Sequence, residues 1–150
     1  MKKPIDSSKF VTVMADASFC PQTKVMGFAG WVKYGAEGAT KEIFGSSRTV
    51  NHSFEAEVEA LERTLEYVHG NIPVQHKTLV VQSDCIGALE HIKDRWERRF
   101  KRKGVRYFRT KHVKGHTHGR PEPRFKLQRW LDKKAKERMR GLRESRKEGE

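Results

Sequence analysis

The sequence predicts an α/β fold: a mixed five-stranded sheet, made of an antiparallel three-stranded meander plus two parallel strands, with helices on both faces. Two observations support this prediction. Strand-like segments occupy the N-terminal third, and helical and strand-like segments alternate from there to the end of the chain. A meander followed by strand–helix units is typical of such a sheet. At 150 residues, the chain is long enough for one domain with a single core.

Segments near the N-terminus have the composition of strands. Residues 10–18 (FVTVMADAS) are β-branched and apolar, which favours a largely buried first strand. The turn CPQTKV precedes a second strand, expected at residues 26–35. After GAEGAT, residues 41–47 (KEIFGSS) are expected to complete the meander, because such polar, Gly-rich turns connect neighbouring antiparallel strands.

From Ser53 to about His69, apolar residues recur at the spacing of a helix. The members of this apolar stripe are Phe54, Val58, Leu61, Leu65 and Val68. The segment NIPVQHK ends the helix, and the apolar run at 78–84 (TLVVQSD) predicts a fourth strand.

A second helix is expected from Ile86 to about Phe100, followed by a fifth strand at 105–113. A long loop, KGHTHGRPEPR, leads into a last helix from Phe125 to about Arg140. The residues expected to be buried in these helices are Ile86, Leu89, Ile92, Trp96, Phe100, Leu127, Leu131, Ala135 and Met139.

The positive charge is concentrated in the C-terminal part of the chain. Residues 1–90 hold 9 Lys+Arg and 11 Asp+Glu, a net charge of −2. Residues 91–150 hold 23 and 8, a net charge of +15. A basic half joined to a nearly neutral half indicates a polyanionic partner, and nucleic acid is the first candidate. A solubilising surface or a disordered basic tail is the alternative.

The remaining composition indicates a reducing compartment. Two cysteines, Cys20 and Cys85, are too few for a disulfide framework or a zinc site. No apolar run approaches the roughly 18 residues that span a bilayer, and MKKPIDSSKF lacks the apolar region of a signal peptide. We therefore expect a cytoplasmic protein that makes no membrane contact.

Four carboxylates stand where charge is unexpected: Asp16, Glu57, Asp84 and Asp132. Asp16 and Asp84 end apolar strand-like runs. Glu57 lies at the edge of a buried helix face, and Asp132 follows a buried position of the last helix. Ligands of open α/β sheets gather at the carboxyl ends of strands. If the fold brings these acids together, they form an all-oxygen site for two Mg²⁺ ions about 4 Å apart, as in two-metal phosphodiester hydrolysis.

Each acid also has a structural explanation. Asp16 can cap a turn, and Asp84 can be the N-cap of the helix that follows it. Glu57 can form a salt bridge, because a carboxylate that points toward a sheet needs a partner. Asp132 lies in a basic stretch, RWLDKKAKER, where a surface ion pair is common.

Helical geometry separates Glu57 from the other glutamates of its helix. At about 100° per residue, the apolar stripe spans about 80°, and Glu57 lies about 20° from its edge, beside Val68. The other glutamates project from the far side, as solvated residues do; they are Glu55, Glu59, Glu62 and Glu66.

At these residues the chain resembles the type 1 ribonuclease H family, from about Phe10 to Met139. The matching motifs are DAS after the first strand, AEVEAL in the first helix, QSD closing the fourth strand, and HVKGHTHG followed by WLDKKAKE. The resemblance implies a ribonuclease H-like domain over residues 1–140, and we expect residues 141–150 to be a basic, frayed tail. It also implies metal-dependent cleavage of the RNA strand of RNA–DNA hybrids, leaving 3′-hydroxyl and 5′-phosphate ends.

The resemblance also implies residue roles. It makes Asp16, Glu57, Asp84 and Asp132 the metal ligands, for Mg²⁺ or for Mn²⁺, which takes the same oxygen ligands. It makes His116 a mobile histidine that assists proton transfer or product release, and an imidazole with a pKa of about 6.5 suits either task. His112, His116 and His118 could instead suggest a zinc cluster, although no cysteine lies nearby.

The chain departs from the family in its basic residues. The separate basic substrate-binding insertion of some members is missing, and the basic run 98–103 can take its place. The loop between His116 and Asp132 is longer than usual in the family. We expect nucleic acid to contact Arg98, Arg99, Lys101, Arg102, Lys103, Lys114, Arg120 and Arg124.

Other departures concern substrate choice. Ala17 replaces the usual glycine, a mild change. Ser53 and Phe54 stand where the family often has asparagines that read the minor groove, and Ile86 stands where a glutamine is common. The 2′-hydroxyl distinguishes RNA from DNA, so the loss of polar readers leaves hybrid specificity open.

Two alternative functions therefore accompany the hybrid nuclease. One is a structure-selective DNA nuclease of the Holliday-junction resolvase type, which acts as a symmetric dimer. The other is a non-catalytic nucleic-acid-binding protein. The sequence has no obvious exposed apolar patch for a dimer, so we expect a monomer.

Overall fold

The computed structural model describes residues 9–48, 50–113 and 123–148, and in the last of these ranges it describes side chains only for residues 130–142. The order of elements is the predicted one. The elements are β1 (Phe10–Cys20), β2 (Val25–Tyr34), β3 (Ala39–Ser47), α1 (Ser53–Asn71), β4 (Thr78–Ser83), α2 (Ile86–Arg102), β5 (Tyr107–His112) and α3 (Pro123–Glu148).

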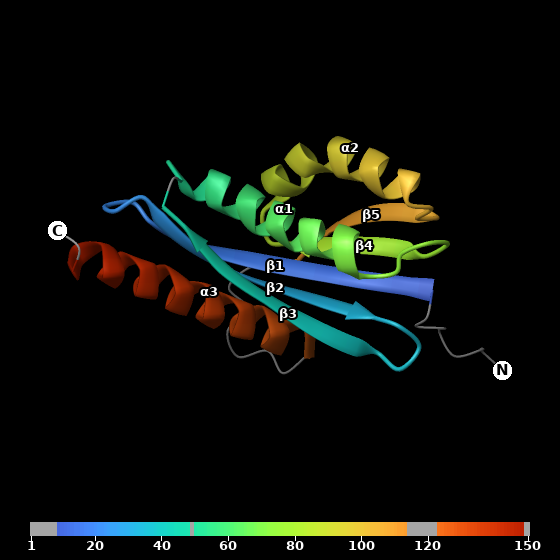
Figure 1. Cartoon of the computed structure of the whole chain (residues 1–150), viewed down its shortest axis with the longest axis horizontal. Helices are drawn as coiled ribbons and strands as arrows, with labels where there is room; N and C mark the ends of the chain where they lie inside the picture. The colour runs from blue at the N-terminus through green and yellow to red at the C-terminus, as the bar shows by residue number, and fades with distance from the viewer. Residues whose placement is uncertain (1–8, 49, 114–122, 149–150) are drawn as a thin grey trace.

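The strands form one mixed sheet in the order β3-β2-β1-β4-β5. β1, β2 and β3 pair antiparallel, whereas β4 pairs parallel with β1 and with β5. Helices α1 and α2 lie on one face of the sheet and α3 on the other (Figure 1). The predicted five-stranded mixed sheet with helices on both faces is confirmed.

β1 is longer than the strand beside it. Its pairing with β2 continues to Cys20, but its pairing with β4 ends where Met14 lies opposite Gln82. From Ala15 onward, β1 therefore pairs only with β2. Side chains that follow the end of β4 can meet those of β1 in this region.

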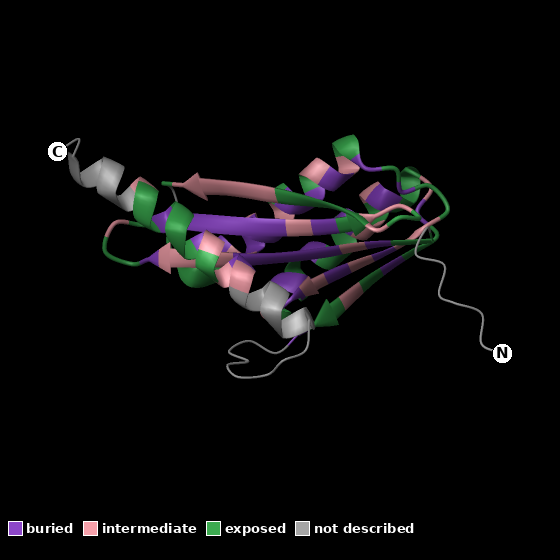
Figure 2. Ribbon diagram, turned by 90° about the horizontal axis from the view of Figure 1, so that it is seen from below, coloured by how far each residue is buried: buried purple, intermediate pink, exposed green. Residues whose placement is uncertain are grey.

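The core has two layers, one on each side of the sheet. Buried positions are concentrated in the central strands, whereas the positions of β3 are intermediate or exposed (Figure 2). Under α1 and α2, residues of β1 such as Val11 and Val13 pack against Leu61 and Trp96. On the α3 side, Leu131 packs in a smaller cluster. The predicted burial of Val58, Leu61, Leu65, Val68, Leu89, Ile92, Trp96, Phe100, Leu131, Ala135 and Met139 is confirmed.

Two predicted core residues lie instead at the surface. Phe54 is 39% exposed and Ile86 is 51% exposed. Both belong to the first turn of a helix, and Phe54 packs against the rings of His52 and His91 rather than against the sheet. Helical periodicity predicted correctly which face of each helix turns toward the sheet. It did not predict that the first turn of each helix lies beyond the part that packs on the sheet.

The helices are longer than predicted. α1 ends at Asn71, α2 at Arg102, and α3 continues past Arg140 to Glu148. That residues 141–150 fray in solution stays a prediction. In the part of the chain that the structure describes, no helix has the length and apolarity to span a membrane.

Two glycines in β2 let helices approach the sheet closely from both sides. A Cβ at Gly27 would lie 2.2 Å from the backbone nitrogen of Met139 in α3. A Cβ at Gly30 would lie 2.3 Å from the hydroxyl oxygen of Thr64 in α1. Since α3 carries Asp132, the absence of a side chain at Gly27 also determines how near that acid comes to β1.

Gly27→Ala is expected to lower the free energy of unfolding by about 3 kcal/mol, because the added methyl group meets helix backbone, which moves only as a unit. Gly70→Ala is the matched control, since a Cβ there has no atom within 4 Å. Its expected effect is a change below about 1 kcal/mol. Urea unfolding followed by circular dichroism measures both, and equal stabilities would contradict the role of Gly27.

Candidate metal centre

Three of the four predicted acids meet beyond the C-terminal end of β4. Asp16 comes from β1, Glu57 from α1 and Asp84 from the turn after β4. One carboxylate oxygen from each lies within 4.8 Å of the others. Because each acid comes from a different element, their meeting is a property of the tertiary fold.

Glu57 is positioned by a well-anchored helix start. His52 is the N-cap of α1, and its Nδ1 accepts a hydrogen bond from the backbone N–H of Glu55 at 3.4 Å. In return, the carboxylate of Glu55 accepts from the backbone N–H of Asn51 at 3.0 Å. This reciprocal arrangement resembles a capping box and holds the first turn. Glu57 follows directly after that turn and projects toward the sheet.

Two hydrogen bonds hold the turn that carries Asp84. The buried hydroxyl of Ser83 accepts a hydrogen bond from the backbone N–H of Cys85 at 3.0 Å. The ring Nε2 of His112, the last residue of β5, lies 3.1 Å from the carbonyl oxygen of Asp84. The N-cap of α2 is Cys85, which makes no side-chain capping bond. The alternative explanation of Asp84 as an N-cap is therefore wrong.

The acids disfavour one another's ionised form. Burial, followed by the negative charges of Asp84 and Asp132, raises the pKa of Asp16 to about 7. Burial, followed by the charges of Asp16 and Asp84, raises the pKa of Glu57 to about 9. The backbone N–H of Ala17 acts in the opposite direction on both pKa values. Near neutral pH, protons or another cation must therefore neutralise part of this cluster.

The buried Glu57 oxygen indicates that a metal cation fits here. Oε2 of Glu57 is buried and has no hydrogen-bond partner. Among the described residues, no ion pair joins Asp16 or Glu57 to a basic side chain, so the predicted alternative of a Glu57 salt bridge finds no support there. A buried polar atom without a partner is costly. Carboxylate oxygens are the ligands of Mg²⁺ and Mn²⁺, and the residues present can hold such an ion.

Asp132 lies beside this cluster, on α3. Its negative charge raises the pKa of both Asp16 and Glu57. Its own side chain is 47% exposed, and its carboxylate forms an ion pair with Lys136 at 2.9 Å. The predicted surface ion pair is therefore present, and Asp132 is not among the three acids that lie within 4.8 Å of one another.

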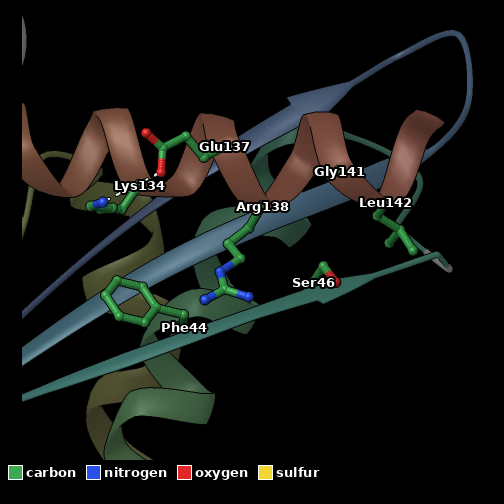
Figure 3. Close-up of a pocket in the computed structure, with 7 residues that line it drawn as sticks. All are labelled: Phe44, Ser46, Lys134, Glu137, Arg138, Gly141 and Leu142. Atoms are coloured by element: carbon green, nitrogen blue, oxygen red, sulfur yellow. Dashed lines mark hydrogen bonds and ion pairs between the residues drawn. The ribbon is translucent and has the colours of Figure 1, made fainter. Parts of the chain in front are cut away.

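Contacts with β3 hold α3 and thereby Asp132. The rings of Phe44 and Trp130 lie 5.7 Å apart, and the guanidinium of Arg138 lies 5.2 Å from the centroid of Phe44. A cavity of about 490 Å³ lies between these elements, with Arg138 extending from α3 toward Phe44 and Ser46 (Figure 3). None of the clustered acids lines this cavity, so it is separate from the candidate metal centre.

The basic run 98–103 lies at the other end of α2 from Asp84, a helix length of about 25 Å away. Several of its charged side chains already form ion pairs or hydrogen bonds within the protein. Arg99 pairs with Glu66 at 3.2 Å and stacks on Trp96, Lys101 pairs with Glu97 at 3.3 Å, and Lys103 donates to a backbone carbonyl. Arg98 and Arg102 are exposed.

Some predicted residues lie outside the described part of the chain. They are Lys114, His116, His118 and Arg120, together with the side chains of Arg124 and Leu127. The structure also adds residues that sequence reasoning missed. Ser83 and His112 position Asp84, and Lys136 pairs with Asp132. The contact of Lys136 had a sequence signal, since Lys136 stands four residues after an acid on the same helix. His112 was considered only as a member of a zinc cluster, not as a partner of Asp84.

Comparison with known proteins identifies the fold. No protein-family model matches the chain, and no curated protein matches it. Solved structures do match: LC11-RNase H1 in complex with an RNA/DNA hybrid has a TM-score of 0.63 at 14% identity, over 88% of this chain and 98% of the other.

Two further structures are similar to the same extent. The N-terminal RNase H domain of a Mycobacterium tuberculosis protein matches with a TM-score of 0.63 at 16% identity, over 91% of this chain and 97% of the other. RNase H1 from the archaeon Halobacterium salinarum matches with a TM-score of 0.62 at 14% identity, over 88% and 98%. The chain therefore has a ribonuclease H fold.

Proposed function

Starting from a ribonuclease H fold with clustered acids, we propose that this protein is a metal-dependent endonuclease that cleaves the RNA strand of RNA–DNA hybrids. The observation that carries the proposal is the meeting of three carboxylates within 4.8 Å of one another, one of them with a buried, unpartnered oxygen. A similar structure was solved with an RNA/DNA hybrid, which supports the choice of substrate.

We assign Asp16, Glu57 and Asp84 as ligands of two Mg²⁺ ions, with Mn²⁺ as the other suitable metal. Asp132 would be the fourth ligand, on the open side of the site, once its carboxylate leaves Lys136. Held by these carboxylates, two ions would supply activation of the attacking water and stabilisation of the leaving oxygen. The carboxylates give up their protons on metal binding, and Ser83 and His112 hold Asp84 in place.

The remaining roles follow from position and charge. We assign proton transfer or product release to His116, which follows the end of β5 in the sequence. The phosphate backbone would contact the basic residues of α2 and of the segment that follows β5. The proposed set is Arg98, Arg99, Lys101, Arg102, Lys103, Lys114, Arg120 and Arg124. The proposed form is a cytoplasmic monomer.

A structure-selective DNA nuclease is the second candidate, because of two exposed apolar side chains. Phe54 lies three residues before Glu57, and Ile86 lies two residues after Asp84. They are 39% and 51% exposed, so both are accessible to a substrate. Neither can donate or accept a hydrogen bond at a 2′-hydroxyl.

A panel of labelled substrates in Mg²⁺ tests the choice: RNA–DNA hybrid, duplex RNA, duplex DNA and a four-way junction. We expect cleavage of the RNA strand of the hybrid alone, with 3′-hydroxyl ends, and its complete loss when EDTA removes the metal. Cleavage of the junction or of duplex DNA with the hybrid intact would establish the second candidate instead.

A further inference from the structure

Half of one sheet face has no helix over it among the described residues. α3 packs on β1, β2 and β3, whereas α2 packs on β4 and β5 from the opposite side (Figure 1). The side chains of β5 differ in exposure between the two faces of the sheet. Phe108 is buried on the α2 side, while Tyr107, Arg109 and Lys111 are exposed on the other. We call this open side the β5 face.

The β5 face carries basic charge without acid. Parallel pairing places Tyr107 beside Thr78, and Lys111 beside Gln82. The members of the face are Phe10, Thr12, Thr78, Val80, Gln82, Tyr107, Arg109 and Lys111. No acidic side chain lies in this set, and Arg106 adds a further cation immediately before β5. The charge of the face is therefore complementary to a polyanion.

An aromatic ring stands among these cations. Tyr107 is 46% exposed. The guanidinium of Arg106 lies 5.2 Å from the centroid of its ring, and that of Arg109 lies 5.4 Å from it. The ring and the two guanidinium groups thus form one exposed unit with a flat surface for stacking and two charges for phosphate.

We propose that the β5 face binds single-stranded nucleic acid, with a base stacked on Tyr107 and phosphates on Arg106, Arg109 and Lys111. Stacking on an aromatic side chain needs a base whose flat face is free, which an unpaired strand offers and the interior of a duplex does not. Single-strand binders combine a basic track with exposed aromatic rings in this way.

The β5 face leads toward the metal centre. Met14 shares a row with Gln82 and Lys111, and Asp16 lies two residues further along β1. The row of Tyr107 lies six residues from Asp16, or about 20 Å at the rise of a strand. A single strand on this face can therefore continue into the site. Binding itself requires neither metal nor cleavage, so this inference does not depend on the proposed activity.

The proposal is tested by fluorescence anisotropy in EDTA with a labelled single-stranded oligonucleotide of uniform sequence, about 12 nucleotides long. Tyr107→Ala is expected to raise the Kd about ten-fold or more, and Tyr107→Phe to keep it within about two-fold, because the ring is retained. Arg109→Gln is expected to reduce the slope of log Kd against log salt by about one. Lys93→Gln, an exposed cation on α2 outside this face, is the matched control and is expected to leave both quantities unchanged.

Several results would overturn the proposal. One is a Kd for Tyr107→Ala within about two-fold of the wild type. Another is an equal loss of binding in Lys93→Gln, which would indicate diffuse charge attraction. A third is binding to a duplex of the same length that depends equally on Tyr107. Unchanged thermal unfolding of each variant shows that a loss of binding does not come from unfolding.

Discussion

Asp84→Asn is expected to slow hybrid cleavage by at least about 1,000-fold, a loss of about 4 kcal/mol of transition-state stabilisation. The amide keeps the shape of the carboxylate but removes its charge from the metal centre. Affinity for the hybrid is expected to stay within about three-fold, because binding depends mainly on cationic residues elsewhere. Single-turnover cleavage in Mg²⁺ and anisotropy in EDTA measure the two effects separately.

Asp94→Asn is the matched control, since Asp94 is an exposed acid on α2 outside the centre. It is expected to cleave like the wild type. If Asp84→Asn cleaves at the wild-type rate, the acid cluster does not take part in the reaction. If wild type and Asp84→Asn both bind the hybrid and neither cleaves any substrate, binding is the function, and the nuclease proposal fails.

The metal-free protein is expected to lose stability as the pH rises from about 4 to 9. In the folded state the pKa of Asp16 is raised to about 7 and that of Glu57 to about 9. The folded protein therefore binds more protons than the unfolded chain in this range. The stability that these protons provide is full below the ordinary carboxyl pKa values of about 4 and is lost as each folded-state pKa is passed.

Glu57→Gln removes the larger part of this loss of stability at high pH, because Glu57 has the higher folded-state pKa. In EDTA at pH 8, we expect it to raise the free energy of unfolding by about 2 kcal/mol or more, and at pH 4.5 to change it little. Glu59→Gln, on the same helix and outside the cluster, is expected to change neither value. Urea unfolding at a series of pH values measures the difference. An effect of Glu57→Gln that is equal at both pH values would contradict a charge-based penalty.

Metal binding provides the complementary measurement. Mg²⁺ at 100 times its Kd is expected to stabilise the wild type by about 2.7 kcal/mol, because it binds only the folded site. Glu57→Gln is expected to gain much less. Equal stabilisation of the two proteins would place the metal elsewhere.

The sheet and its helices could be predicted because the patterns that define them are local. The stripe from Val58 to Val68 and the apolar runs of β1 and β4 identify both the type and the order of the elements. Helix ends were less predictable. α3 continues eight residues past Arg140, because its basic surface residues are as compatible with a helix as with a tail.

The candidate metal centre could be predicted only in part. The projection of Glu57 toward the sheet followed from helical geometry, and the meeting of Asp16 with Asp84 followed from the rule for strand ends. The anchoring of Asp84 by His112 could not be predicted, because the two residues lie 28 positions apart and meet only through the pairing of β4 with β5. The exposure of Phe54 likewise depends on the approach of α2.

The early end of β4 gives the acid cluster a geometry that depends on a count of residues. Asp84 comes level with Asp16 because each stands two residues after the pair of Gln82 and Met14. Two more residues in β4 would leave every side chain on its present face, since the alternation has a period of two. They would nevertheless carry Asp84 about 7 Å past Asp16 and fill the space between the three acids with backbone. In this fold, the length of a strand is as much a part of the chemistry as the acids themselves.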